Sequence, residues 1–227
     1  MAVIKRMSLV DQVYEKLKDK IVQLKIPFGS KLNVSKLQEE YGVSSTPVRE
    51  ALNRLLNEGL IEFENNVGAR VIDITEDDVR RIQEVSFAYE MAAARYAMKR
   101  GDREGMIREI GQYIEEYKNS QGVIESCSCI RNIKAVFYKN SDNAMLIDSM
   151  ESLNGLDQVL HSLFSMPREK GGSGEFYHTG ISYFETIYKA IQNDDFASVC
   201  DGLEGHQLWA RKYIVKNLET VKEQQGK

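Results

Sequence analysis

Hydrophobic side chains recur every three or four residues over positions 8–25, which is the spacing of one helix face. They are Val10, Val13, Leu17, Ile21 and Leu24. Ser8 precedes them and is a good N-cap residue, so the pattern predicts a first helix over 8–25. Pro27 cannot continue a helix and Gly29 adds flexibility, so a turn follows.

The next stretch predicts a tight turn between two further helices. Asn33 or Ser35 caps a short helix that ends at Tyr41, and Gly42 allows a positive φ at the turn. A third helix then runs over 44–58, where apolar residues again repeat at helical spacing.

The third helix is amphipathic, and Gly59 ends it. Its apolar face consists of Val48, Leu52, Leu55 and Leu56. Another face carries short polar groups and a cation near the helix N-terminus, which is the composition of a helix that reads base edges in the DNA major groove. These residues are Ser44, Ser45, Thr46, Arg49 and Asn53. On this segment alone, an ordinary amphipathic surface helix is the alternative.

Two short segments after the third helix alternate apolar and polar residues, with the period of a strand. They span residues 60–64 and 69–74 and flank the turn-forming sequence Asn-Asn-Val-Gly at 65–68, so they predict a β-hairpin. Three helices followed by a hairpin make a winged helix-turn-helix domain, which we place at residues 1–74.

This segment resembles the N-terminal domain of the GntR family of bacterial transcription regulators. The resemblance rests on Gly-Val-Ser-Ser-Thr-Pro-Val-Arg-Glu-Ala-Leu at 42–52, Glu-Gly-Leu at 58–60 and Asn-Val-Gly at 66–68. It implies a homodimer that binds double-stranded operator DNA of palindromic sequence. The third helix then enters the major groove and the tip of the hairpin, the wing, enters the minor groove.

The resemblance also indicates which side chains contact DNA. Residues at the family's contact positions are Thr46, Arg49 and Gly68. Positions that usually carry a cation in the family hold Ser45, Val67 and Ser35, the last followed by Lys36. Because each lost cation removes a phosphate or guanine contact, the operator sequence cannot be taken over from relatives. The candidate DNA-binding residues are Lys36, Ser44, Ser45, Thr46, Arg49, Asn53 and Gly68.

Residues 75–227 predict an all-α antiparallel bundle, so the fold class is mostly α. Thr75 with Asp78 reads as a capping box at its start. Helices are expected near 75–100, 103–119, 122–140, 142–166, 175–193 and 195–219, with an irregular segment at 167–174 in which 171–174 form a flexible linker. This part resembles the FCD-type effector domain of FadR/VanR-like regulators, through Asn143 in a turn before a helix, Ala190-Ile191 before an aspartate turn, and His206.

Many relatives with this effector domain bind a divalent metal through one aspartate and three histidines. The matching positions here are Ile130, Lys134, Phe184 and His206. One imidazole cannot hold a metal whose sites take three or four protein ligands, so we predict neither a metal nor another cofactor. Lys134 either pairs with an acid of the fold, binds an anionic ligand such as an organic acid, or extends to solvent. The candidate effector-binding residues are Ile130, Lys134, Tyr138, Phe184 and His206, for which a core role is the alternative.

Composition adds limits to this interpretation. The chain has 227 residues, 42% of them hydrophobic and 28% charged, and a formal net charge of −4. Residues 1–74 hold 11 basic against 10 acidic side chains, or +1, so DNA binding requires the cations to cluster on one face. No apolar run approaches a membrane span, and three cysteines predict reduced thiols in a cytoplasmic protein. No sequence signature of an enzyme is present.

The sequence therefore predicts a ligand-responsive, homodimeric transcription regulator, usually a repressor in this family. The alternative is a constitutive DNA-binding dimer whose effector domain only dimerises. Neither the effector, the operator nor the sign of regulation follows from the sequence.

Overall fold

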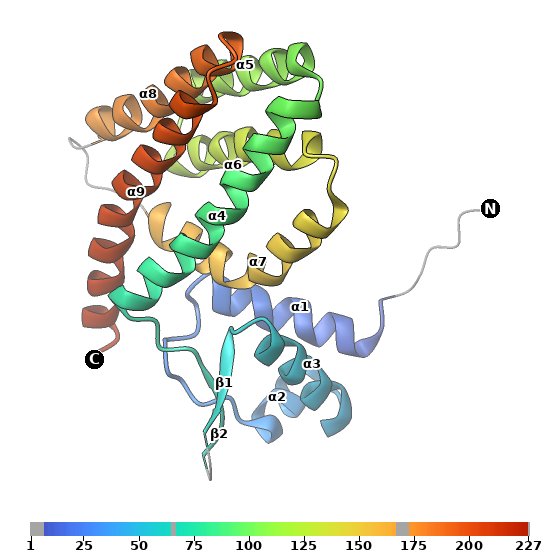
Figure 1. The fold of residues 1–227 in the computed structure, drawn as a ribbon. Coiled ribbons are helices and arrows are strands. Elements are labelled where there is room, and N and C mark those ends of the chain that lie inside the picture. The colour runs from blue at the N-terminus through green and yellow to red at the C-terminus, as the bar shows by residue number, and fades with distance from the viewer. Residues whose placement is uncertain (1–6, 65–66, 167–172, 227) are drawn as a thin grey trace.

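The computed structural model describes residues 7–64, 67–166 and 173–226. Its elements are α1 Leu9–Val22, α2 Val34–Tyr41, α3 Ser45–Asn57, β1 Ile61–Glu64, β2 Gly68–Val71, α4 Glu76–Arg100, α5 Arg103–Asn119, α6 Val123–Asn140, α7 Ala144–Phe164, α8 Ser173–Gln192 and α9 Phe196–Gln224. Helices α1–α3 and the hairpin form one end of the molecule, and α4–α9 form a helical bundle over them (Figure 1). The predicted fold class, a winged helix-turn-helix followed by a helical bundle, is confirmed.

The helix starts follow the predicted caps. Ser8 and Thr75 each form a capping box with the acid three residues later, and the Asn33 side chain accepts hydrogen bonds from two backbone amides of α2. Helix α1 ends earlier than predicted, at Val22, because Leu24 adopts a left-handed conformation with φ of 59°.

Two glycines set the geometry around α3. Gly42 has a φ of 65° and Gly59 a φ of 69°, as the predicted turns require. Between them α3 buries its apolar face against α1, except at Leu56, whose side chain is 38% exposed. The prediction for Leu56 was wrong because residues 55 and 56 point about 100° apart on a helix, and Leu55 takes the buried direction.

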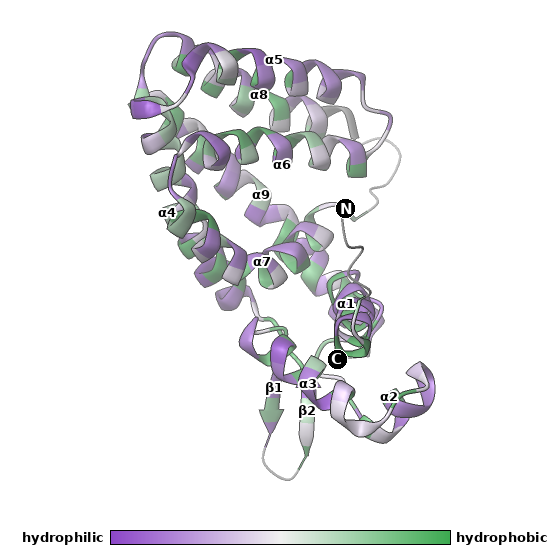
Figure 2. Ribbon diagram, turned by 90° about the vertical axis from the view of Figure 1, so that its right-hand side faces the viewer, coloured by the Kyte–Doolittle hydropathy of each residue, from purple (hydrophilic) through white to green (hydrophobic). Residues whose placement is uncertain are grey.

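The wing is a two-stranded antiparallel hairpin in which Ile61 pairs with Val71 and Glu64 with Gly68. The second strand stops at Val71, short of the predicted residue 74, and residues 65–66 lie outside the described part. The Leu32 amide donates to the Ala69 carbonyl at 2.8 Å, which ties the segment before α2 to the wing. Figure 2 shows the hairpin and α2 projecting away from the bundle.

In the bundle, α9 packs along α4, α7 and α8, while α5 packs between α6 and α8. Helix α9 extends to Gln224, beyond the predicted residue 219, because Val221 is still buried. Of the predicted irregular segment, residues 167–172 lie outside the described part, whereas 173–174 of the predicted linker already belong to α8, so that end of the linker was predicted wrongly. No helix among the described residues has the length and apolar character needed to cross a membrane.

Helix α7 joins the bundle to the winged domain. A Cβ at Gly155 would lie 2.9 Å from Leu60 Cδ1, so this glycine permits a close approach of α7 to the start of the wing. Beside it, Leu156 covers Gly59. A second contact comes from the end of α9, where Lys222 forms an ion pair with Asp73 at 2.9 Å.

Candidate functional site

The predicted DNA-binding side chains gather at one groove of the winged domain. Arg49 and Asn53 of α3 line it on one side, Gly68 of the wing on the other, and Ser35 of α2 lies near its end. Arg49 and Asn53 are exposed. The fold therefore brings the third helix, the wing and the start of α2 to a single surface.

The two arginines of α3 have different roles. Arg54 donates to Asp11 at 2.7 Å and its guanidinium lies 4.0 Å from the centre of the Tyr14 ring, so it holds α3 to α1. Arg49 forms no ion pair with any described residue and its side chain reaches solvent. An exposed, unpaired guanidinium at this position can bind a phosphate or a guanine edge.

The remaining predicted residues surround the groove without lining it. Ser44 is the N-cap of α3, but its side chain forms no capping hydrogen bond, and Thr46 is exposed beside it. Ser45 is partly buried, and Lys36 is exposed on α2.

Sequence reasoning missed two groove residues, Lys31 and Phe63. The backbone of Lys31 forms an isolated antiparallel β-bridge with Arg70 of the wing. Phe63 of β1 is 53% exposed. A signal for Phe63 was present in the sequence. A hydrophobic residue near the tip of a two-stranded wing has no core to cover it, so its side chain is expected to be exposed.

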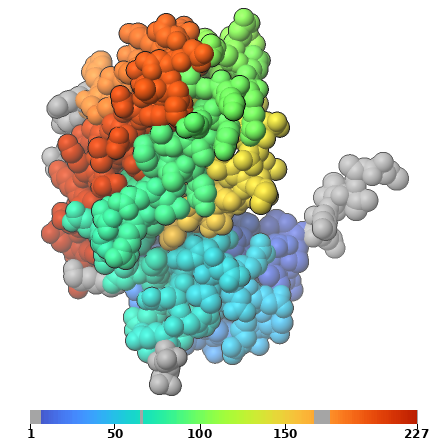
Figure 3. Space-filling view, viewed as in Figure 1, coloured from blue at the N-terminus to red at the C-terminus, as the bar shows by residue number. Residues whose placement is uncertain are grey.

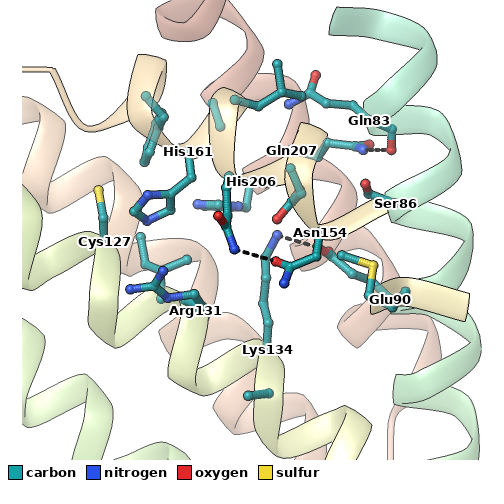
Figure 4. Close-up of a pocket in the computed structure, with 18 of the residues that line it drawn as sticks. Gln83, Ser86, Glu90, Cys127, Arg131, Lys134, Asn154, His161, His206 and Gln207 are labelled. Atoms are coloured by element: carbon teal, nitrogen blue, oxygen red, sulfur yellow. Dashed lines mark hydrogen bonds and ion pairs between the residues drawn. The ribbon is translucent and has the colours of Figure 1, made fainter. Parts of the chain in front are cut away.

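A second site lies inside the bundle, where α4, α6, α7 and α9 enclose a cavity of about 270 Å³ (Figure 4). Four predicted effector residues line it, namely Ile130, Lys134, Tyr138 and His206. Phe184 does not. It is fully buried behind His206, with ring centres 4.7 Å apart, because α8 faces the opposite side of that histidine.

Lys134 points into the cavity and pairs with an acid of the fold. Its Nζ lies 2.6 Å from Glu90 Oε1 of α4. Burial raises the pKa of Glu90, while the charge and hydrogen bond of Lys134 act to lower it. Burial likewise raises the pKa of Asp157, against the fields of Lys134 and Arg131. Lys134 is thus neither a free cation nor a surface residue.

Both cavity histidines favour the neutral form. Burial, and secondly the charge of Lys134, places the pKa of His206 well below its ordinary value. Burial followed by the charge of Arg131 lowers the pKa of His161. A neutral imidazole presents one donor and one acceptor.

Several polar atoms at the cavity lack a hydrogen-bond partner among the described residues. They are Ser86 Oγ, Tyr138 Oη, His161 Nε2 and both ring nitrogens of His206. Buried polar groups in native proteins are nearly always paired, so this cluster has hydrogen-bonding capacity left for water or a ligand.

Sequence reasoning missed Ser86, Glu90, Asp157 and His161. A signal existed for two of them, because Asp157 and His161 are four residues apart and so share one face of α7. This acid–histidine pair is on a different helix from the metal ligands of the relatives. Within the described ranges, no group of three or more His, Cys, Asp or Glu side chains is arranged to hold a metal ion.

Comparison with known proteins agrees with the N-terminal geometry. Residues 9–71 match the family model described as bacterial regulatory proteins, gntR family. The N-terminal domain is a GntR-family helix-turn-helix domain. The uncharacterized HTH-type transcriptional regulator BphR of Paraburkholderia xenovorans is 31% identical over 106 residues, 47% of this chain and 43% of that protein.

The gluconate operon transcriptional repressor of Bacillus subtilis is 32% identical over 109 residues, 48% of this chain and 44% of the relative. The matched region therefore spans less than half the length of either relative. A crystal structure of a GntR transcriptional regulator from Rhodococcus sp. RHA1 covers 92% of this chain and 99% of its own, with a TM-score of 0.67. At 16% identity it shows a shared fold only. These similar proteins are transcription regulators, which is not an enzyme family.

Proposed function

We propose that this protein is a cytoplasmic, ligand-responsive transcription regulator of the FadR/VanR-like branch, with an FCD-type effector domain. It binds palindromic operator DNA as a homodimer and acts as a repressor. The groove between α3 and the wing supports DNA binding, since it joins an unpaired Arg49 to Asn53 and Gly68. The cavity with its unpartnered polar atoms supports a small-molecule effector.

The observation that carries the proposal is the position of α7. One of its faces supplies Asn154, Asp157 and His161 to the cavity, and another packs Gly155 and Leu156 on the winged domain. A ligand that rotates or shifts α7 therefore also moves α3 and the wing. Such a ligand can change the affinity for DNA only to the extent that it binds one arrangement of α7 and the winged domain more tightly than the other.

An exposed apolar row on α4 supports the homodimer. Val85 is 46% exposed and Tyr96 37% exposed, eleven residues apart and so on one helix face. Leu208 of α9 is 48% exposed. Figure 3 shows α4 and α9 side by side on one face of the bundle. Sedimentation of the protein and of Val85→Glu with Leu208→Glu tests this surface, and we expect the double variant to be monomeric.

Fluorescence anisotropy with DNA from the region upstream of the protein's own gene tests the function. We expect salt-sensitive binding, and release or tightening by a compound that also raises the melting temperature. The alternative, a constitutive DNA-binding dimer, predicts unchanged DNA affinity with every compound that stabilises the protein.

A further inference from the structure

The unpartnered atoms at the cavity come from all four of its helices. Ser86 belongs to α4, Tyr138 to α6, His161 to α7 and His206 to α9. Figure 4 shows His206 near the centre of the cavity, with His161 and Ser86 on opposite sides of it. A molecule in this space is therefore met by polar groups from several directions, which requires hydrogen-bonding groups around its periphery.

These atoms are all uncharged hydrogen-bonding groups. The hydroxyls of Ser86 and Tyr138 can donate and accept, and a neutral imidazole offers one donor and one acceptor. None of them carries a charge, because burial lowers the pKa of both histidines and raises that of Tyr138. Alcohol groups complement such a set, since each of them also donates and accepts.

Of the charged groups at the cavity, the lysine is already engaged by an acid of the fold. Lys134 is bound to Glu90 at 2.6 Å, and Asp157 lies in the fields of Lys134 and Arg131. The lining thus holds two acidic and two basic side chains. A carboxylate ligand would have to displace Glu90 from Lys134 and lie near Asp157, and a cationic ligand would meet Lys134 and Arg131. Either ligand would therefore bring its charge next to a group of the same sign.

The cavity is small and partly apolar. Its volume of about 270 Å³ lies slightly below the roughly 300–1,000 Å³ of typical ligand pockets. Ile130, Phe164 and Ile214 supply apolar surface that can cover carbon-bound hydrogens of a ligand. A compact ring with hydroxyls at its edge matches both the polar groups and these walls.

We propose that the effector of this pocket is a neutral, polyhydroxylated molecule of monosaccharide size. The inference rests on the proposed function, because it names the ligand class of the same pocket. It departs from the organic acid that was one of the possibilities at the sequence level, since Lys134 is engaged by Glu90.

Calorimetry with matched six-membered rings tests the class. Glucose, galactose, xylose and myo-inositol are the neutral probes, while glucuronate carries a carboxylate and glucosamine an ammonium on the same ring. We expect at least one neutral probe to bind roughly tenfold or more tightly than either charged one. A charged probe should lose at least one hydrogen bond to the cavity, and each lost bond lowers affinity by about a factor of ten.

Single-hydroxyl variants locate the binding. Tyr138→Phe and Ser86→Ala each remove one unpartnered oxygen, and we expect a roughly tenfold loss of affinity for the bound probe. Tyr41→Phe is the matched control, since its buried hydroxyl lies in the winged domain, and it should bind the probe like the wild type.

DNA anisotropy in the same samples separates the two proposals. Tighter binding of glucuronate than of any neutral probe, with a change in DNA affinity, overturns the ligand class and leaves the regulator intact. If no probe binds at millimolar concentration while DNA binding persists, the ligand class is overturned and the proposed DNA-binding function stands. Loss of DNA binding itself contradicts the proposed function.

Discussion

The ammonium of Lys134 on α6 and the carboxylate of Glu90 on α4 lie 2.6 Å apart and join two helices that line the bundle cavity. Both side chains are largely buried, with 24% and 11% of their surface exposed. In such a pair each ion offsets the desolvation of the other, so removing one partner leaves a costly charge in the bundle.

Replacing Lys134 by methionine keeps the packing of the side chain and leaves Glu90 without its counterion. We expect a loss of about 3 kcal/mol in the free energy of unfolding, measured by urea denaturation. Adding Glu90→Gln to the same chain should recover a large part of that loss. Lys139→Met on the same helix α6 is the control, because the pair of Lys139 with Glu109 of α5 is more exposed, and it should cost less than about 1 kcal/mol. Equal effects of the two single variants would show that the Lys134 pair is solvated.

His206 makes stability depend on pH. Its folded pKa is lowered below the ordinary 6.5, so only the unfolded chain gains a proton there as the pH falls through that value. Stability is therefore present above pH 6.5 and lost on acidification. Between about pH 7.5 and about pH 5.5, the unfolding free energy of His206→Gln should fall by about 1 kcal/mol less than that of the wild type. His178→Gln, at an exposed position of α8, should leave the wild-type pH profile unchanged.

Arg49 is expected to contact operator DNA directly. Arg49→Ala should weaken binding by about 1–3 kcal/mol if the side chain reads a base, or lower the salt slope by about one if it binds a phosphate. Anisotropy across a salt series distinguishes the two results. Arg108→Ala, an exposed change in α5, serves as the control. Unchanged affinity and slope in a folded Arg49 variant would refute the contact.

Gly155 should be intolerant of larger side chains. Because a Cβ there would lie 2.9 Å from both Leu60 Cδ1 and Glu58 Oε2, valine should lower the unfolding free energy by about 1–3 kcal/mol. It should also alter DNA affinity, since α7 would be pushed from the winged domain. Gly122→Val is the matched control, as nothing lies within 4 Å of its Cβ position. Full stability and unchanged DNA affinity of Gly155→Val would show that α7 does not seat there.

The protein should purify with little transition metal. Ile130 and Lys134 stand where the family resemblance puts metal ligands, and an ammonium near His206 repels a cation. Elemental analysis of protein made without a chelator or a metal-affinity tag should give substoichiometric zinc, nickel and manganese. A full equivalent that is lost in His206→Ala would contradict this expectation.

The positions of the helices could be predicted from sequence because their determinants are local. Apolar spacing, the caps at Ser8, Asn33 and Thr75, and the turns at Gly42 and Gly59 act within a few residues of one another. The error at the end of α1 also had a local cause. Leu24 adopts a left-handed conformation, which ends the helix earlier than the apolar spacing predicts.

The GntR-type motif at 42–52 likewise allowed a prediction of the face of α3 that contacts DNA, because recognition by a single helix depends on neighbouring side chains. Only the tertiary structure determined which side chains line the cavity in the bundle. Glu90 and Lys134 are 44 residues apart in the chain, and only the crossing of α4 and α6 gives the lysine an internal partner. The same packing excluded Phe184 from the pocket and brought in His161, since which face of a bundle helix meets a cavity depends on its rotation against three neighbours.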